Sequence, residues 1–210
     1  MPKIIDMENY PRKKHFDYFR SLPNPYVGLT AEVDVTALVD SCRRSGRSFF
    51  LAFMHAAVLA ADSVPQFRQR IDGEGIVEYE HCPSSHTLLL DNGSYCYCNV
   101  KHNMDTDSYF LHAEKMVEEY RDRGSIDEDE DVQSMYFISS VPWLSYTALV
   151  QPSGDDSNPR ITWGKYKEDF RGRLMMPVSV LVHHALMDGI HIAAFYKALD
   201  KLVSDLAEEV

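Results

Sequence analysis

The chain has 210 residues, of which 45% are hydrophobic and 25% are charged, so it can build a packed core and global disorder is not expected. Lys and Arg total 21 against 32 Asp and Glu, which gives a formal net charge of −11. That acidity argues against a nucleic acid or an anionic membrane surface as the main partner, because both require a surface of opposite charge.

The length suits a single domain that spans residues 1–210. No stretch approaches the roughly 18 apolar residues needed to cross a bilayer. The amino end, MPKIIDMENYPRKKHF, lacks the apolar centre of a signal peptide. These features predict a cytoplasmic protein without a membrane partner.

In the first half of the chain, apolar spacing and turn residues predict alternating helices and strands. Gly46 and Pro65 are typical helix ends, and Asp72-Gly73 and Asn92-Gly93 supply the positive φ values of tight hairpin turns. The predicted elements are helices at 12–21, 36–45 and 48–64, a strand at 26–35, and hairpins at 68–80 and 86–100.

In the second half, a helix is predicted at 107–121, followed by the acidic run 127–131, which is predicted to be a solvated loop because like charges repel. A last helix is predicted to begin near Asp188-Gly189. Strands are predicted at 135–140, 144–150, 160–168 and 173–183. Strands outnumber the available crossover helices, so we expect a single-domain α/β two-layer sandwich, in which a mixed and largely antiparallel sheet has helices on one face.

The four cysteines are Cys42, Cys82, Cys96 and Cys98, and none has CxxC spacing. Cys96 and Cys98 flank Tyr97 in an alternating run, so they should share one face of a strand. Buried thiols are the favoured interpretation, with a redox or metal role as the alternative.

The segment richest in reactive side chains is the apolar strand that ends at His183-His184 and is followed by Asp188. Successive side chains of a strand point to opposite faces, which argues against a metal site formed by both histidines with Asp188 and His191. A histidine at a strand end is suited to act as a general base, because its ordinary pKa of about 6.5 allows a neutral imidazole at working pH. The sequence leaves open the alternative of a core histidine with satisfied hydrogen bonds.

Several motifs occur together in a fixed order. They are Arg12-Lys13-Lys14-His15-Phe16, Val33-Asp34-Val35-Thr36, Pro65-Gln66-Phe67-Arg68, Ser139-Ser140-Val141-Pro142-Trp143, Thr162-Trp163-Gly164-Lys165-Tyr166 and HHALMDG at 183–189. In this order and with similar spacing, they resemble the R-K-E-H-F, D-I-T, P-E-F-R, S-A-x-P-W, T-M-G-K-Y and HHxxxDG motifs of the chloramphenicol acetyltransferase family. Dihydrolipoamide acyltransferases share the last motif in looser form.

The resemblance implies catalytic roles for matched residues. It implies that His184 removes the proton of an acceptor hydroxyl, that Ser139 stabilises the oxyanion and that Thr162 holds an ordered water. It also implies that Asp188 forms a supporting ion pair with Arg12, and that the backbone carbonyl of His184 itself sets the imidazole tautomer. The alternative role for Asp188 is the third member of a Ser-His-Asp triad.

The resemblance implies that acetyl-CoA is the co-substrate and that no metal is needed. Lys165, Tyr166 and Phe50 fall where the family contacts CoA, with Phe50 in place of a tyrosine. Ser48 replaces a lysine that would meet a phosphate, and Arg47 could compensate.

For the acceptor pocket, the resemblance implies aromatic walls from Phe19 and from Tyr95 or Tyr97. Pro23 and Pro25 stand where the family has other pocket residues. The family also implies a homotrimer, in which one subunit donates the histidine and its neighbour donates the acceptor wall.

The expected function is acetyl transfer from acetyl-CoA to a hydroxyl of chloramphenicol. One alternative is the same chemistry on a different small-molecule hydroxyl or thiol; its dihydrolipoamide branch is disfavoured because no lipoyl segment precedes the domain. The other is a binding homologue without turnover, against which the presence of His184 and Ser139 counts.

Overall fold

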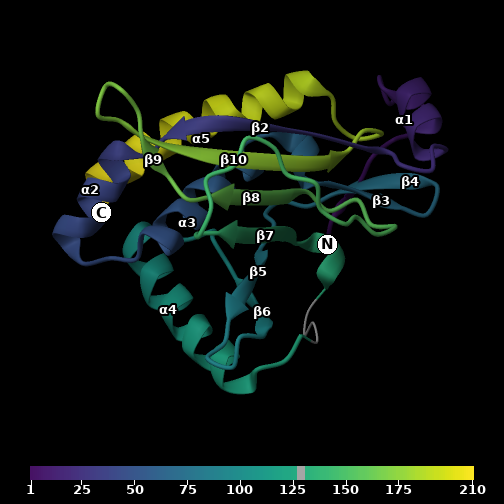
Figure 1. Ribbon diagram of the computed structural model, residues 1–210. Coiled ribbons are helices and arrows are strands. Elements are labelled where there is room, and N and C mark those ends of the chain that lie inside the picture. The colour runs from purple at the N-terminus through teal and green to yellow at the C-terminus, as the bar shows by residue number, and fades with distance from the viewer. Residues whose placement is uncertain (127–130) are drawn as a thin grey trace.

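The computed structural model describes residues 1–126 and 131–210, and its described part holds two sheets and five α-helices (Figure 1). The large sheet has the strand order β2-β10-β8-β7-β5-β6, and β9 pairs with β10. Its strands are β2 (Tyr26–Asp34), β5 (Ser84–Leu89), β6 (Tyr95–Val100), β7 (Tyr136–Val141), β8 (Arg160–Gly164), β9 (Lys167–Glu168) and β10 (Leu174–His183). Only β5 with β7 and β7 with β8 pair in parallel among these described strands.

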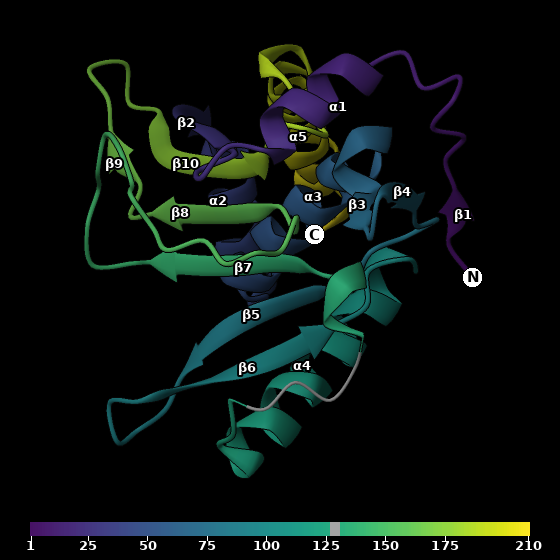
Figure 2. The same cartoon turned by 90° about the vertical axis from the view of Figure 1, so that its right-hand side faces the viewer.

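A small antiparallel sheet joins β1 (Lys3–Ile4), β4 (Gly75–Glu78) and β3 (Gln69–Asp72), and Figure 2 shows it beside the large one. The helices are α1 (Lys13–Arg20), α2 (Thr36–Ser45), α3 (Phe49–Asp62), α4 (Thr106–Arg123) and α5 (Gly189–Glu209), with short 3-10 helices η1 (Pro65–Arg68) and η2 (Val132–Ser134). Figures 1 and 2 show α2, α3 and α5 on one side of the large sheet. The predicted fold class, a mixed and largely antiparallel sheet with helices on one face, is therefore confirmed.

Helix α3 forms the centre of the core. Nearly all of its side chains from Leu51 to Ala61 are buried, and the Ser48 side chain caps it by accepting from the backbone N–H of Leu51. Its alanines leave room for close approach by neighbouring elements. Helix α5 packs against α3 with a single apolar stripe at spacings of three and four residues: Ile192, Phe195, Leu199, Val203 and Leu206.

Most predicted elements occur within a few residues of their expected bounds, including the αL cap of α2 at Gly46, where φ is 76°. The predicted strand at 144–150 is wrong, because this segment is not in a sheet. It crosses the sheet over Gly164, where an added Cβ would lie 2.7 Å from the Leu144 carbonyl oxygen. The Tyr146 hydroxyl donates to the Thr162 carbonyl at 2.9 Å, which anchors the segment to β8.

The predicted strand at 160–168 is divided into β8 and β9 by Lys165 and Tyr166. All four cysteines are free and buried, which confirms the prediction of buried thiols. The acidic run 127–131 lies outside the described residues except for Asp131. Among the residues described, no helix is both long and apolar enough to span a bilayer.

Candidate active site

His184 lies in the turn that connects the end of β10 to α5. Its backbone N–H donates to the Pro25 carbonyl at 2.7 Å, which ties this turn to the segment between α1 and β2. Its ring stacks on Phe19, with centroids 3.8 Å apart and an interplanar angle of 17°. The His184 side chain is 27% exposed, so it is held by packing and still reachable from outside.

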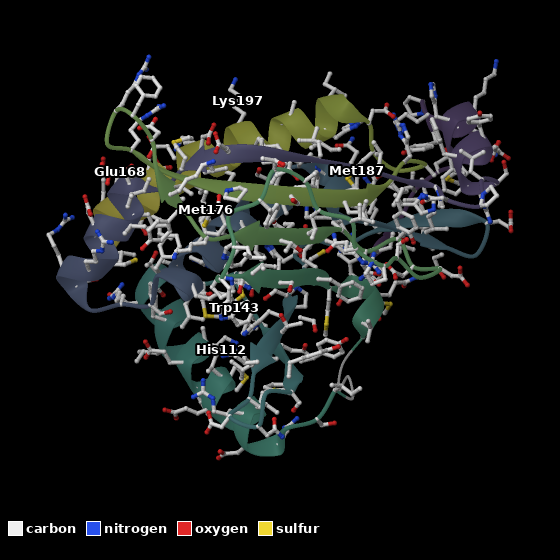
Figure 3. The ribbon with its side chains drawn as sticks, viewed as in Figure 1. His112, Trp143, Glu168, Met176, Met187 and Lys197 are labelled. Atoms are coloured by element: carbon white, nitrogen blue, oxygen red, sulfur yellow. The ribbon has the colours of Figure 1, made fainter. Side chains whose placement is uncertain are left out.

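The hydrogen bonds of His184 define its tautomer. Nδ1 lies 2.9 Å from the backbone carbonyl oxygen of Met187, a residue that Figure 3 labels. A carbonyl only accepts, so Nδ1 carries the hydrogen and the lone pair is on Nε2. No described residue is a hydrogen-bond partner of Nε2. The ring is therefore prepared to accept a proton through Nε2.

The carbonyl that sets this tautomer differs from the expected one. The backbone oxygen of His184 itself accepts from Nη2 of Arg12 at 3.1 Å, so it is used to position Arg12. The turn brings the Met187 carbonyl under the ring, because Leu186 and Met187 fold back to donate to the His183 carbonyl.

Asp188 contacts both Arg12 and His184, the two partners considered for its carboxylate. Its Oδ2 forms an ion pair with Nη1 of Arg12, and its Oδ1 lies 3.2 Å from Nδ1 of His184. The backbone N–H of Asp188 also donates to Nδ1 of His191 at 2.9 Å. The ion pair and the triad-like contact, which the sequence presents as alternatives, therefore coexist on one carboxylate.

Replacing Asp188 with asparagine is expected to reduce both stability and activity. The substitution leaves the Arg12 guanidinium, which is only 15% exposed, without its counter-charge. A fully buried broken pair costs about 3–5 kcal/mol, and partial exposure reduces this to about 1–3 kcal/mol. Urea unfolding and steady-state assays measure the two effects.

The matched control for this variant is Asp205→Asn, which removes a carboxylate from an exposed pair with Lys201. Its free energy of unfolding should change by less than about 0.5 kcal/mol. If Asp188→Asn behaves like the control in both assays, the supporting role of Asp188 is wrong.

His183 points away from His184, as the strand alternation predicts. It is buried, packs edge-to-face with Tyr26, and its Nδ1 accepts from the Ala185 N–H at 3.2 Å. Burial lowers the pKa of His183 to about 4, so it stays neutral. The described part of the chain has no group of three His, Cys, Asp or Glu side chains placed to hold a metal ion.

Ser139 and Thr162 are opposite each other on the parallel strands β7 and β8. Together with Tyr97 they line a cavity of about 590 Å³, here called the Ser139 cavity. The Ser139 hydroxyl lies 3.2 Å from that of Thr87, and the Thr162 hydroxyl donates to Oε1 of Gln151 at 3.2 Å. Two hydroxyls thus face one space that is large enough for a small molecule.

His184 does not line the Ser139 cavity. Thr162 is opposite Ser179 on β10, and His184 follows Ser179 by five residues, which is about 16 Å along the strand. The expected acceptor residues are divided in the same way: Phe19 is stacked on His184, whereas Tyr97 lines the cavity. Within one chain, the candidate base and the candidate oxyanion donor are separate.

Tyr95 is the other tyrosine expected to form an aromatic wall of the acceptor pocket. Its side chain is 50% exposed, and its ring centroid lies 5.8 Å from that of Tyr97. Tyr95 is not among the residues that line the Ser139 cavity.

The candidate CoA residues lie near the amino end of α3. Phe50 packs against Trp163 and His86, with both centroid distances at 5.4 Å, and lines a second cavity of about 340 Å³. Tyr166 packs edge-to-face on Phe49 at 5.7 Å, and Lys165 is exposed. These side chains offer an aromatic surface and one cation.

Arg47, considered above as a substitute for the missing lysine, is engaged elsewhere. It forms an ion pair with Asp107 at 2.5 Å and lies over the Phe110 ring at 4.7 Å. Its charge is therefore partly neutralised by α4.

Most residues that line the Ser139 cavity were not predicted from the sequence; among them are Thr87, Gln151, Asp156 and Arg160. Arg160 could have been found, since it precedes Thr162 by two residues on a strand and must share its face. The others come from β5 and from the segment that crosses the sheet, and no local pattern connects them to Ser139.

Comparisons with known proteins agree with this architecture. The family model described as "CAT: Chloramphenicol acetyltransferase" matches residues 2–200. A chloramphenicol acetyltransferase of Streptomyces acrimycini is 28% identical over 98% of this chain and 96% of its own length. A solved chloramphenicol acetyltransferase structure, also 28% identical, superposes with a TM-score of 0.85 over 97% of this chain and all of the other.

A more distant structure shares the fold. The cubic core of a pyruvate dehydrogenase multienzyme complex, 18% identical, has a TM-score of 0.70 over 90% of this chain and 85% of its own. The match of the family model to residues 2–200, and the full-length relatives, show that this chain is an acyltransferase-like enzyme that belongs to the chloramphenicol acetyltransferase family.

Proposed function

We propose that residues 1–210 form one acetyltransferase domain that transfers the acetyl group of acetyl-CoA to a hydroxyl of chloramphenicol. The observation that supports this most is the state of His184, whose Nδ1 donates to a carbonyl while Nε2 has no partner among the described residues. A ring held in this way can take a proton at Nε2 and return it. Relatives named chloramphenicol acetyltransferase support acetyl transfer.

In the proposed mechanism, Nε2 of His184 removes the proton of the acceptor hydroxyl as its oxygen attacks the thioester carbonyl carbon. The hydroxyl of Ser139 donates to the oxyanion that forms there, and Thr162 holds a water beside it. The C–S bond then breaks, and the imidazolium of His184 returns its proton to the leaving CoA sulfur. Asp188 stabilises the imidazolium while its ion pair with Arg12 keeps the turn in place.

The proposed assembly is a homotrimer with active sites between subunits. The separation of His184 from Ser139 along the sheet supports it, because one chain cannot present both groups to the same acceptor. His184 and Phe19 of one chain would face the Ser139 cavity of the next. Phe50, Lys165 and Tyr166 are the proposed contacts to CoA.

The direct test of the proposed function is thiol release from acetyl-CoA. Purified enzyme should release thiol only when both acetyl-CoA and chloramphenicol are present. Release with another hydroxyl or thiol, but not with chloramphenicol, would favour a different acceptor. Release with none of them would favour the binding homologue.

Replacing Ser139 with alanine is expected to lower kcat by about 10²–10³-fold, the effect of removing one oxyanion donor in comparable sites. The control is Ser140→Ala, which removes a hydroxyl from the opposite face of β7 and should keep kcat within about twofold. Steady-state kinetics with thermal melting measures both. Equal activities of the two variants would contradict the role of Ser139.

The same Ser139→Ala chain tests the shared site. Co-refolded with His184→Ala chains, it should recover activity, because a mixed trimer contains sites in which the Ser139→Ala chain supplies His184 and the neighbouring His184→Ala chain supplies Ser139. No recovery in mixed trimers would contradict a site built from two subunits.

A further inference from the structure

The Ser139 cavity has a charged pair in its wall. Nη1 and Nη2 of Arg160 donate to the two carboxylate oxygens of Asp156 at 3.0 and 2.7 Å. Both residues line the cavity, and their side chains are 13% and 31% exposed. Among the described residues that line the cavity, these two carry the charged side chains, and hydroxyl and amide groups accompany them.

Asp156 and Arg160 differ in how many of their hydrogen-bonding groups are already used. Asp156 accepts from both Nη atoms of Arg160 and, through Oδ1, from the backbone N–H of Asn158. Arg160 has five N–H groups, of which three are used, by Asp156 and by the Asn158 carbonyl. Its Nε–H and one Nη2–H have no partner among the described residues. The pair therefore has spare donors, whereas its carboxylate is largely occupied.

The position of Arg160 is fixed by packing. Its guanidinium lies 5.2 Å from the Phe137 ring centroid and 5.9 Å from that of Tyr26. Arg160 is opposite Phe137 on β7, two residues from the level of Ser139 and Thr162. Two residues of strand correspond to about 7 Å.

Gln151, which also lines the Ser139 cavity, offers further hydrogen-bond donors. Gln151 accepts from Thr162 through Oε1, which leaves its amide N–H groups without a partner among the described residues. Gln151 and Arg160 therefore supply donors that an apolar substituent would leave unpaired. Sites with such donors discriminate strongly against ligands that cannot satisfy them.

We infer that Arg160 determines acceptor specificity in this enzyme by donating to a hydrogen-bond-accepting oxygen of the acceptor; its backbone lies two strand residues, about 7 Å, from the level of Ser139 and Thr162. The inference rests on the proposed function, since it places the reacting hydroxyl beside Ser139 and Thr162. A carboxylate or an amide carbonyl beside the guanidinium of Arg160 would bind through charge-assisted hydrogen bonds.

Three acceptors that differ only at this position test the inference: 4-(hydroxymethyl)benzoate, 4-(hydroxymethyl)benzamide and 4-methylbenzyl alcohol. The wild-type enzyme should show a kcat/KM at least about tenfold higher for the two oxygen-bearing acceptors than for the methyl one. Arg160→Leu should abolish this preference. Asp156→Asn should raise the ratio of kcat/KM for the carboxylate acceptor to kcat/KM for the carboxamide acceptor, because it leaves the Arg160 charge uncompensated.

Equilibrium binding separates this inference from the proposed function. By calorimetry, 4-(hydroxymethyl)benzoate should bind Arg160→Leu at least about tenfold more weakly than wild type, whether or not acetyl transfer occurs. If Arg160→Leu does not fold, the opposite shift in Asp156→Asn is the deciding result. Equal wild-type kcat/KM for the three acceptors, or equal binding by both proteins, would overturn the role of Arg160. Absence of thiol release with every acceptor would count against the proposed function alone.

Discussion

Replacing His184 with alanine is expected to lower kcat for acetyl transfer by about 10²–10⁴-fold, the contribution of a positioned general base. An alcohol has a pKa far above neutrality, so without a base its oxygen is a poor nucleophile. The ring of His184 is held by Phe19 and by the Met187 carbonyl, and only Nε2 is left to act. No other described side chain in this turn has the same geometry.

A second substitution separates chemistry from packing. In His184→Gln, an amide N–H can still donate to the Met187 carbonyl, but the side chain cannot take up a proton at neutral pH. Both variants should lose activity to a similar extent. His15→Ala, which removes an exposed histidine from α1, is the control and should keep full activity.

Thermal melting completes this test. The melting temperature of His184→Gln should stay close to that of wild type, because the ring is partly exposed and its turn is held by backbone hydrogen bonds. Full activity in a folded His184→Ala protein would show that another group is the base.

The second large effect is expected in acid. His55, His86, His102 and His183 are all buried; burial lowers the pKa of His55, His86 and His183 to about 4 and also holds the pKa of His102 well below its ordinary value. In the unfolded chain these groups titrate near pH 6.5. Between about pH 6.5 and 4 the unfolded state therefore binds more protons than the folded state.

This difference in bound protons makes the folded state less stable as the pH falls. The stabilising contribution of the four neutral rings is present above pH 6.5 and is lost as the pH falls toward 4. Each histidine contributes a slope of about 1.4 kcal/mol per pH unit, so the four together reach about 5 kcal/mol per pH unit. Urea unfolding at pH 7.5, 6 and 5 should show a steep decrease in the free energy of unfolding.

His86 allows a sharper version of this experiment. Its ring nitrogens have no hydrogen-bond partner of good geometry among the described residues, although the backbone of Cys98 opposite it favours the protonated form. His86→Leu should therefore keep or increase the free energy of unfolding at pH 7.5. It should also reduce the slope of that free energy against pH by the contribution of one histidine, about 1.4 kcal/mol per pH unit. His15→Ala should leave the slope unchanged. A slope that is the same in all three proteins would show that buried histidines do not control acid stability.

The interiors of the long elements could be predicted from the sequence because their signals are local. The apolar run before Pro65 predicts a buried helix, and α3 ends at Asp62, close to that proline. Gly46 predicts the end of α2, where only a residue that tolerates positive φ fits easily. In contrast, alternation at 144–150 predicts a strand that does not form, because this segment crosses the sheet over Gly164 and is held there by the hydrogen bond from Tyr146 to Thr162.

The candidate site likewise contains features with local sequence signals and features that depend on how the chain folds. The HHALMDG motif indicates His184 and its turn, because strand, turn and helix cap follow each other within seven residues. The choice of the Met187 carbonyl, rather than that of His184, depends on how the turn folds back onto β10. Residue types alone do not indicate which of these two carbonyls the ring contacts.

By itself the sequence determined the family, the helices and most strands, and the candidate residues for acetyl transfer, because each depends on neighbours within a few positions or on a motif. Only the tertiary structure decided that Ser139, Thr162 and the Asp156–Arg160 pair share one cavity, and that His184 lies about 16 Å further along the sheet. The physical reason is that strand order and register join segments dozens of residues apart, and no local periodicity encodes which strands become neighbours.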